Sequence, residues 1–225
     1  MTTGTETDAP LTHARVLGIA LPIVAMGMST PLLGLVDTAI IGRLGDAALI
    51  GAVAVGALIF TFLFWAFGFL RMGTTGLTAQ ALGADDGEEI RASFGRAFLI
   101  AVIAGVLLLG LQYPLRELAF LLIQGSGTVE AHALTYFDIR MWSAPFTLTN
   151  YAVLGWLVGM QRTRLAMGLQ IFLNSLNASL DALFVLSFGW GVQGIALGTV
   201  AAETTTALAG LGLIAMLLRQ RGGRW

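Results

Sequence analysis

Three carboxylic acids stand within stretches of the sequence that are otherwise almost free of charge. Asp37 directly follows the apolar run 16–36, and Asp181 and Glu203 interrupt the apolar stretch 165–218. A carboxylate surrounded by hydrocarbon costs about 3 kcal/mol, so it normally faces the protein interior, where it is protonated, paired or bound to a cation. The chain contains no Lys, so none of the acids has a lysine partner. Each is therefore a candidate for proton or cation chemistry.

Polar side chains recur at helical spacing beside these acids. Asn174, Asn177 and Asp181 stand at i, i+3 and i+7, on one stripe of a helix. Thr199 and Glu203 share a face at i, i+4. Carboxylate, amide and hydroxyl oxygens are the hard ligands that Na⁺ prefers, and a set made only of oxygens argues against a transition metal. Two neighbouring carboxylates can also share one proton. We therefore predict a site for H⁺ or Na⁺, with simple interhelical hydrogen bonding as the alternative role of Asn and Thr. The predicted site consists of Asp37, Asn177, Asp181 and Thr199.

The composition indicates an all-α membrane protein. Hydrophobic residues make up 56% of the chain, charged residues 11%, and the mean hydropathy is +0.83, whereas soluble proteins carry about 25% charge. A helix needs roughly 20 apolar residues to cross a bilayer, and the runs here are continuously apolar, without the alternation of a β-barrel strand. We predict a polar N-terminal tail (1–14), a six-helix transmembrane lobe (15–218) and a basic C-terminal tail (219–225). The six helices are expected at about 16–41, 47–81, 93–115, 136–160, 165–187 and 193–218.

Arginine placement predicts the orientation of these helices. With the N-terminus inside, eight arginines lie near cytoplasmic helix ends and three, Arg43, Arg116 and Arg140, lie outside. This bias predicts a multi-pass protein of the cytoplasmic (inner) membrane with both termini in the cytoplasm. The net charge of −1 gives no basic surface for nucleic acid, and the polar leader without a basic start predicts no signal cleavage.

The predicted topology assigns depths to the acids. Asp37 and Asp181 lie about 7 and 10 Å below the outer ends of their helices, at a shared level, and Glu203 lies near the middle of the bilayer. Glu203, Asn150 and Asn174 are the polar side chains that we expect at a cavity.

The first helix also contains Pro22 and Pro31, each of which removes a backbone hydrogen bond and makes bending easy. A static kink is the alternative to a hinge.

Several runs of residues occur in an order and at a spacing typical of one transporter family. They are VDTAIIGRLG (36–45), FLRMGTTGLTAQALGA (69–84), RMWSAPF (140–146), GWLVGMQR (155–162) and NASLD (177–181). Over residues 15–218 the chain resembles the multidrug and toxic compound extrusion (MATE) transporters, and the second run is similar to the DinF-like branch. The resemblance implies an antiporter, coupled to H⁺ or Na⁺, that exports organic and often cationic compounds, with two six-helix lobes around a cavity. It implies no enzyme activity and no cofactor besides the coupling ion.

The same resemblance implies roles for particular residues. The acid of helix 1, the Asn and Asp of helix 5 and the Thr of helix 6 form the ion or proton site of the N-terminal lobe, and a proline of helix 1 acts as its hinge. These roles fall on Asp37, Asn177, Asp181 and Thr199, with Pro22 or Pro31 as the hinge.

The chain departs from this family in length. It ends at Trp225, after the sixth helix, where the family continues into a second lobe. We therefore expect either a non-transporting fragment or a lobe that works with a missing second lobe or a second copy of the chain. A passive six-helix channel is a further alternative. A Ser/His hydrolase has little support, because neither histidine lies in an apolar run and no Gly-x-Ser-x-Gly motif occurs. The expected partners are lipid and small organic substrates.

Overall fold

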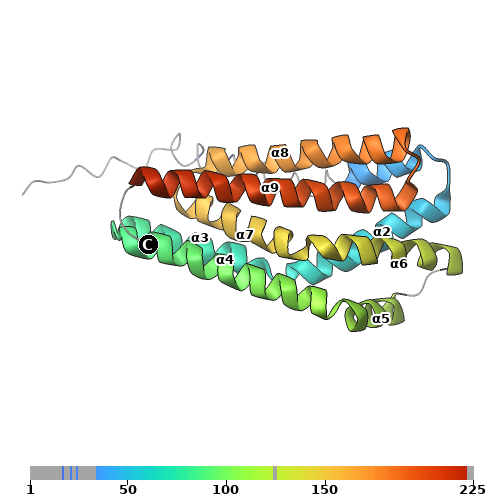
Figure 1. The fold of residues 1–225 in the computed structure, drawn as a ribbon, viewed down its shortest axis with the longest axis horizontal. Helices are drawn as coiled ribbons and strands as arrows, with labels where there is room; N and C mark the ends of the chain where they lie inside the picture. The colour runs from blue at the N-terminus through green and yellow to red at the C-terminus, as the bar shows by residue number, and fades with distance from the viewer. Residues whose placement is uncertain (1–16, 18–20, 22–23, 25–33, 124–125, 222–225) are drawn as a thin grey trace, which may run out of the picture.

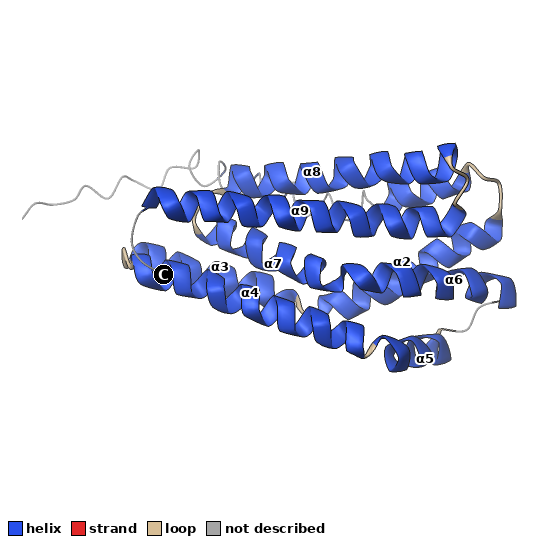
Figure 2. Ribbon diagram, viewed as in Figure 1, coloured by secondary structure: helices blue, strands red, loops and turns tan. Residues whose placement is uncertain are grey.

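Helices form every regular element in the part of the chain that the structure describes. The computed structural model describes residues 17, 21, 24, 34–123 and 126–221 of the 225-residue chain. Most of its helices run along the long axis of the molecule (Figure 1), and Figure 2 shows no strand among these residues. The predicted all-α fold is confirmed. Pro22 and Pro31 lie outside the described residues.

The helices divide the chain more finely than the predicted spans. After a helical segment at 34–42 they are α2 (Ala47–Trp65), α3 (Gly68–Gly83), α4 (Gly87–Gly110), α5 (Gln112–Leu122), α6 (Gly127–Arg140), α7 (Ala144–Gly159), α8 (Thr163–Ala182) and α9 (Gly191–Arg221). Within the described ranges, four helical stretches are long and apolar enough to cross a membrane, at 47–83, 87–110, 163–187 and 191–221. Helices α6 and α7, joined by a short 3₁₀ turn, occupy the region where a further span is expected.

Two prolines explain two of the helix boundaries. Helix α4 ends at Gly110 and α5 begins at Gln112, inside the range 93–115 where one helix was expected. Pro114 has no N–H, and its ring collides with the carbonyl of the residue four positions earlier in a continuous helix, so the chain breaks there. Pro145 stands in the first turn of α7, where a missing N–H costs nothing. The chain therefore bends between α6 and α7 and continues.

Helix α7 lies in the middle of the bundle because small residues let its neighbours approach. It packs against α3, α4 and α9, while α8 lies along α9 (Figure 1). A Cβ at Gly155 would lie 2.6 Å from the carbonyl oxygen of Arg71, and one at Gly159 would lie 2.7 Å from that of Thr75. The Thr75 hydroxyl also donates to the Gly155 carbonyl oxygen at 3.0 Å. Backbone contact of this kind is the usual means of joining helices in lipid.

A second polar contact fixes α7 against α4. The buried indole N–H of Trp156 donates to the carbonyl oxygen of Ile90 at 3.0 Å. Phe94 packs edge-on against the same indole, with ring centroids 6.0 Å apart. With α7 held on both sides, its polar residues and those of α6 before it have defined positions in the bundle.

The Gly159→Ala substitution tests the close approach of α3 and α7. The added methyl should destabilise the protein by about 1–3 kcal/mol, because the carbonyl of Thr75 cannot move without displacing its helix. Gly168→Ala on α8 is the matched control, since a Cβ there meets no other atom, and it should be neutral or stabilising by up to about 1 kcal/mol. Thermal unfolding of the two variants in detergent measures the difference. Equal unfolding temperatures would show that the two helices are not in backbone contact.

Candidate functional site

Asp37 and Asp181 come together from helices that are far apart in the sequence. Asp37 lies in the helical segment 34–42 and Asp181 near the end of α8, and their exposed fractions are 7% and 0%. The two carboxyl groups are close enough to hydrogen-bond to each other when one of them is protonated. Oδ1 of Asp37 and both carboxyl oxygens of Asp181 are buried without a hydrogen-bond partner among the described residues. Two adjacent buried carboxylates cannot both remain charged and unpaired, so the pair requires a proton or a cation.

Asn177 stands one helical turn before Asp181 on α8, and it is hydrogen-bonded to Thr199 of α9. Asn177 is fully buried on α8, and its amide nitrogen donates to the Thr199 hydroxyl of α9 at 3.1 Å. That hydroxyl donates in turn to the Ile195 carbonyl oxygen at 2.9 Å. The amide oxygen of Asn177 has no partner in the described part of the chain. The hydrogen-bond chain thus leaves the amide oxygen of Asn177 available to accept a hydrogen bond or to bind a cation.

Gly198 makes room for Asp181 where α8 and α9 meet. A Cβ at position 198 would overlap Oδ1 of Asp181 and would lie 3.2 Å from its backbone nitrogen. Directly after Asp181 the helix widens into a π-helical turn at Leu183–Ser187, a distortion that often occurs beside functional residues. A side chain at Gly198 would thus push the carboxyl group out of the space that it occupies.

Arg140 is the functional candidate that sequence reasoning missed. The arginine count placed it at an outer helix end, but it did not predict that the side chain is buried in the bundle, where its exposed fraction is 8% and its Nη2 lies 3.6 Å from Oε1 of Glu203. It also interacts electrostatically with Asp37 and Asp181. The position is a consequence of the bent α6–α7 path, which continues past Arg140 instead of leaving the bundle there. The signal was present in the sequence, since Arg140 falls within the span expected at 136–160.

Glu203 is held by α6 and α7 rather than by the aspartate pair. The Asn150 amide nitrogen donates to Oε2 of Glu203 at 2.6 Å and to its carbonyl oxygen at 3.1 Å. The Thr147 side chain is a further hydrogen-bonding neighbour. With Arg140 on its other oxygen, Glu203 is part of a cross-link between three helices.

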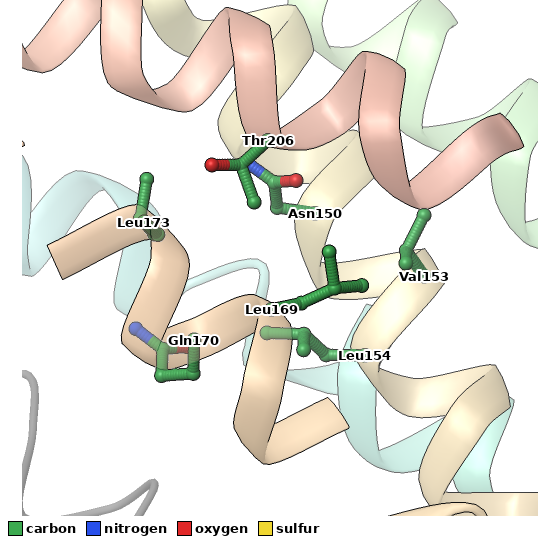
Figure 3. Close-up of a pocket in the computed structure, with 7 residues that line it drawn as sticks. All are labelled: Asn150, Val153, Leu154, Leu169, Gln170, Leu173 and Thr206. Carbon is green, nitrogen blue, oxygen red and sulfur yellow. The ribbon is translucent and has the colours of Figure 1, made fainter. Parts of the chain in front are cut away.

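A narrow pocket lies beside this cross-link, between α7, α8 and α9. Its lining residues, drawn in Figure 3, are Asn150, Val153, Leu154, Leu169, Gln170, Leu173 and Thr206. It has room for about one water molecule. Of the three residues expected at a cavity, Asn150 lines this pocket. Glu203 faces Arg140 instead. Asn174 is half-buried and accepts a hydrogen bond from Gln170 at 3.2 Å. The described residues contain no cluster of His, Cys, Asp and Glu side chains that could hold a metal ion.

Comparison with known proteins finds one family. The model of the MatE family matches residues 22–183. DNA damage-inducible protein F of Escherichia coli K12 is 42% identical over 218 residues, which are 97% of this chain and 46% of that protein. The chloroplastic protein DETOXIFICATION 47 of Arabidopsis thaliana is 25% identical over 83% of this chain and 34% of its own length. The chain therefore spans about half or less of the length of these relatives.

Solved structures share the fold. A MOP superfamily transporter from Pyrococcus furiosus superposes with a TM-score of 0.79 at 22% identity, covering 87% of this chain and 43% of that one. An outward-facing multidrug resistance MATE family transporter of the MOP superfamily gives a TM-score of 0.76 at 22% identity, with the same two coverages of 87% and 43%. The arrangement of helices in the described residues is thus that of half of such a transporter.

Replacing Thr199 by Val tests the hydrogen-bond chain of the site. The substitution keeps the shape of the side chain but leaves the buried Asn177 amide without an acceptor, so it should destabilise the protein by about 1–3 kcal/mol. Thr205→Val on the same helix is the matched control, because that exposed hydroxyl donates only to the Ala201 carbonyl, and it should change stability by less than about 0.5 kcal/mol. Thermal unfolding in detergent compares the two. Equal effects would mean that Asn177 does not depend on Thr199.

Proposed function

The chain belongs to the MATE family, and from this premise we propose that it is one lobe of an antiporter that exports organic, often cationic, compounds. The observation that carries the proposal is the buried Asp37–Asp181 pair, in which Oδ1 of Asp37 and both carboxyl oxygens of Asp181 lack a hydrogen-bond partner among the described residues. In this proposal Asp37, Asn177, Asp181 and Thr199 bind the coupling ion, H⁺ or Na⁺.

The proposed coupling follows from the charge of the pair. Protons or Na⁺ entering down their gradient neutralise the two carboxylates, which weakens the attraction of the lobe for a cationic compound. Because the two states of charge stabilise different arrangements of the helices around the pair, ion binding shifts the population between them. The free energy of the inward ion gradient can thereby drive outward movement of the compound.

A second lobe is part of the proposal. The chain covers 46% of the Escherichia coli relative and 43% of each of the two superposed transporter structures. Alternating access needs two bodies that move against each other around one cavity. A second six-helix lobe, or a second copy of this chain, is the partner that would complete the cavity.

The distribution of arginine supports a position in the cytoplasmic membrane with both termini in the cytoplasm. The α3–α4 and α7–α8 connections lie at the same end of the bundle as the last turns of α9 (Figure 1). Arginines gather in these segments, and positive charge marks the cytoplasmic side. They are Arg91, Arg96, Arg162, Arg164, Arg219 and Arg221.

Neutralising the acid pair tests the proposed coupling. In the intact protein that contains this chain, reconstituted into vesicles, Asp181→Asn and Asp37→Asn should each reduce gradient-driven efflux of a cationic dye to the level of protein-free vesicles. The reason is that an amide in either position removes the charge change on which coupling depends. Imposing a proton gradient and a Na⁺ gradient separately identifies the coupling ion.

Glu117→Gln is the control for this measurement. Its side chain is 60% exposed and pairs with its neighbour Arg116, so the variant should transport like the unmodified protein. Coupled efflux that survives both aspartate substitutions would refute the proposed site. Dye movement that never exceeds equilibrium, and that an uncoupler does not alter, would instead identify a channel.

A further inference from the structure

The buried charges in the described part of the chain do not balance. Its buried acids are Asp37, Asp181 and Glu203, and its buried cations are Arg91 and Arg140. Arg91 lies in the first turn of α4 and donates to the Gly87 carbonyl oxygen, at the end of the bundle. Arg140 is the cation that interacts with all three acids. One guanidinium therefore serves three carboxyl groups.

The Arg140 side chain is anchored at one edge. Nη2 lies 3.6 Å from Glu203, and its Cζ lies 5.4 Å from the ring centroid of Phe60 and 5.6 Å from that of Phe64. Glu203 is itself fixed by two hydrogen bonds from Asn150. The other nitrogen, Nη1, is buried and has no hydrogen-bond partner among the described residues. A guanidinium normally uses its donors when it is buried, and this one keeps Nη1 unpaired while it interacts electrostatically with Asp37 and Asp181 and lies beside the Tyr136 hydroxyl.

We propose that Arg140 is a positioning residue that governs proton release from the Asp37–Asp181 pair, and that Glu203 limits its action by holding the guanidinium. The inference rests on the proposed function in one respect, because it takes the pair as the group that changes charge. It assigns Glu203 a role different from that of a cavity or substrate residue. The acid serves as the fixed counter-ion of the arginine that controls the coupling pair.

The direction of the effect follows from the signs of the charges. A positive guanidinium favours the ionised form of the aspartates and so promotes loss of their proton. Glu203 opposes this by neutralising the guanidinium and by holding it at a distance. The other titratable groups around the cluster are Tyr136 of α6, which faces Arg140 and both aspartates, Tyr151 of α7, which faces Glu203, and Arg71 of α3, which faces Tyr151.

Substitutions of Arg140 and Glu203 should therefore act in opposite directions. In E203Q the guanidinium loses its counter-ion and acts fully on the pair, so the pair should release its proton at a pH lower by about one unit, a tenfold change in proton affinity. In R140M the pair loses its cation and should keep its proton to a pH higher by about one unit. The double variant R140M/E203Q removes both charges and should return to within about half a unit of the unmodified protein.

Infrared titration measures this midpoint directly, without transport. The intact protein that contains this chain is titrated in detergent, and the absorption of protonated carboxyl groups is followed against pH. The part of the signal that disappears in Asp181→Asn belongs to the pair. R116M is the matched control, because Arg116 pairs with Asp138, 3.1 Å away and apart from this cluster, and its midpoint should not move.

Folding of the variants does not limit the test. R140M leaves Glu203 buried without its cation, which is strongly destabilising. Where that variant fails to fold, E203Q and the double variant still decide, because Arg140 keeps the two aspartates as opposite charges in E203Q and the double variant removes both members of the ion pair. A downward shift in E203Q that the double variant reverses supports the proposal.

The proposal and the proposed function fail in different ways. Midpoints in E203Q and R140M that stay at the unmodified value, or move in the same direction, overturn the role of Arg140 even if Asp181→Asn abolishes coupled efflux. Opposite shifts together with unchanged coupled efflux in Asp181→Asn would support the role of Arg140 and refute the coupling site.

Discussion

The burial of two adjacent carboxyl groups is the constraint on which the rest of this structure depends. Asp37 and Asp181 are 7% and 0% exposed, in a protein whose surroundings in lipid offer no water to solvate them. Such groups persist only if something nearby compensates their charge. The buried Arg140, the polar pair Asn177 and Thr199, and the exchangeable proton or cation are the compensation available here. Without the two acids, none of these groups would be needed to compensate charge, and burial of the Arg140 guanidinium would destabilise the protein.

Placing these groups together depends on small residues and on bends more than on the polar contacts themselves. Gly198 admits the carboxyl group of Asp181 between α8 and α9, and the π-helical turn after Asp181 changes the course of α8 directly beyond it. Gly105 allows α4 to approach the backbone of Pro145, where the chain bends between α6 and α7. That bend keeps Arg140 inside the bundle. The positions of Asp181 and Arg140 therefore depend on how closely the helix backbones pack, and residues in the apolar stretches of the sequence determine that packing.

The sequence was sufficient to predict the all-α fold and to group Asp37, Asn177, Asp181 and Thr199 as neighbours, but it did not predict the burial of Arg140. Asp37, Asn177, Asp181 and Thr199 could be grouped because helical periodicity and distance from a helix end are local properties, and because the family resemblance pointed to the same positions. The burial of Arg140 could not be predicted in this way. The assignment of arginines to one side of the membrane assumes that each side chain near a helix end reaches the lipid headgroups. Its burial depends on Glu203, 63 positions later, and on a bend whose direction no local pattern specifies. The break before α5 was similarly missed, although Pro114 marks it.

The proposed role of Arg140 changes how competition between a cationic compound and protons can arise in such a lobe. Competition is usually understood as two ligands sharing the same carboxylates, which requires the compound to reach them. Here Asp181 is fully buried, whereas the Asn150 side chain that holds Glu203 also lines the pocket beside it. A cation that binds near Glu203 weakens its hold on Arg140, the released guanidinium favours the ionised aspartates, and their protons leave. By linkage, protonation of the aspartates must weaken binding of that cation by the same factor. Under the proposed arrangement, exchange of compound for proton follows without a shared ligand, because one guanidinium is attracted to both sites.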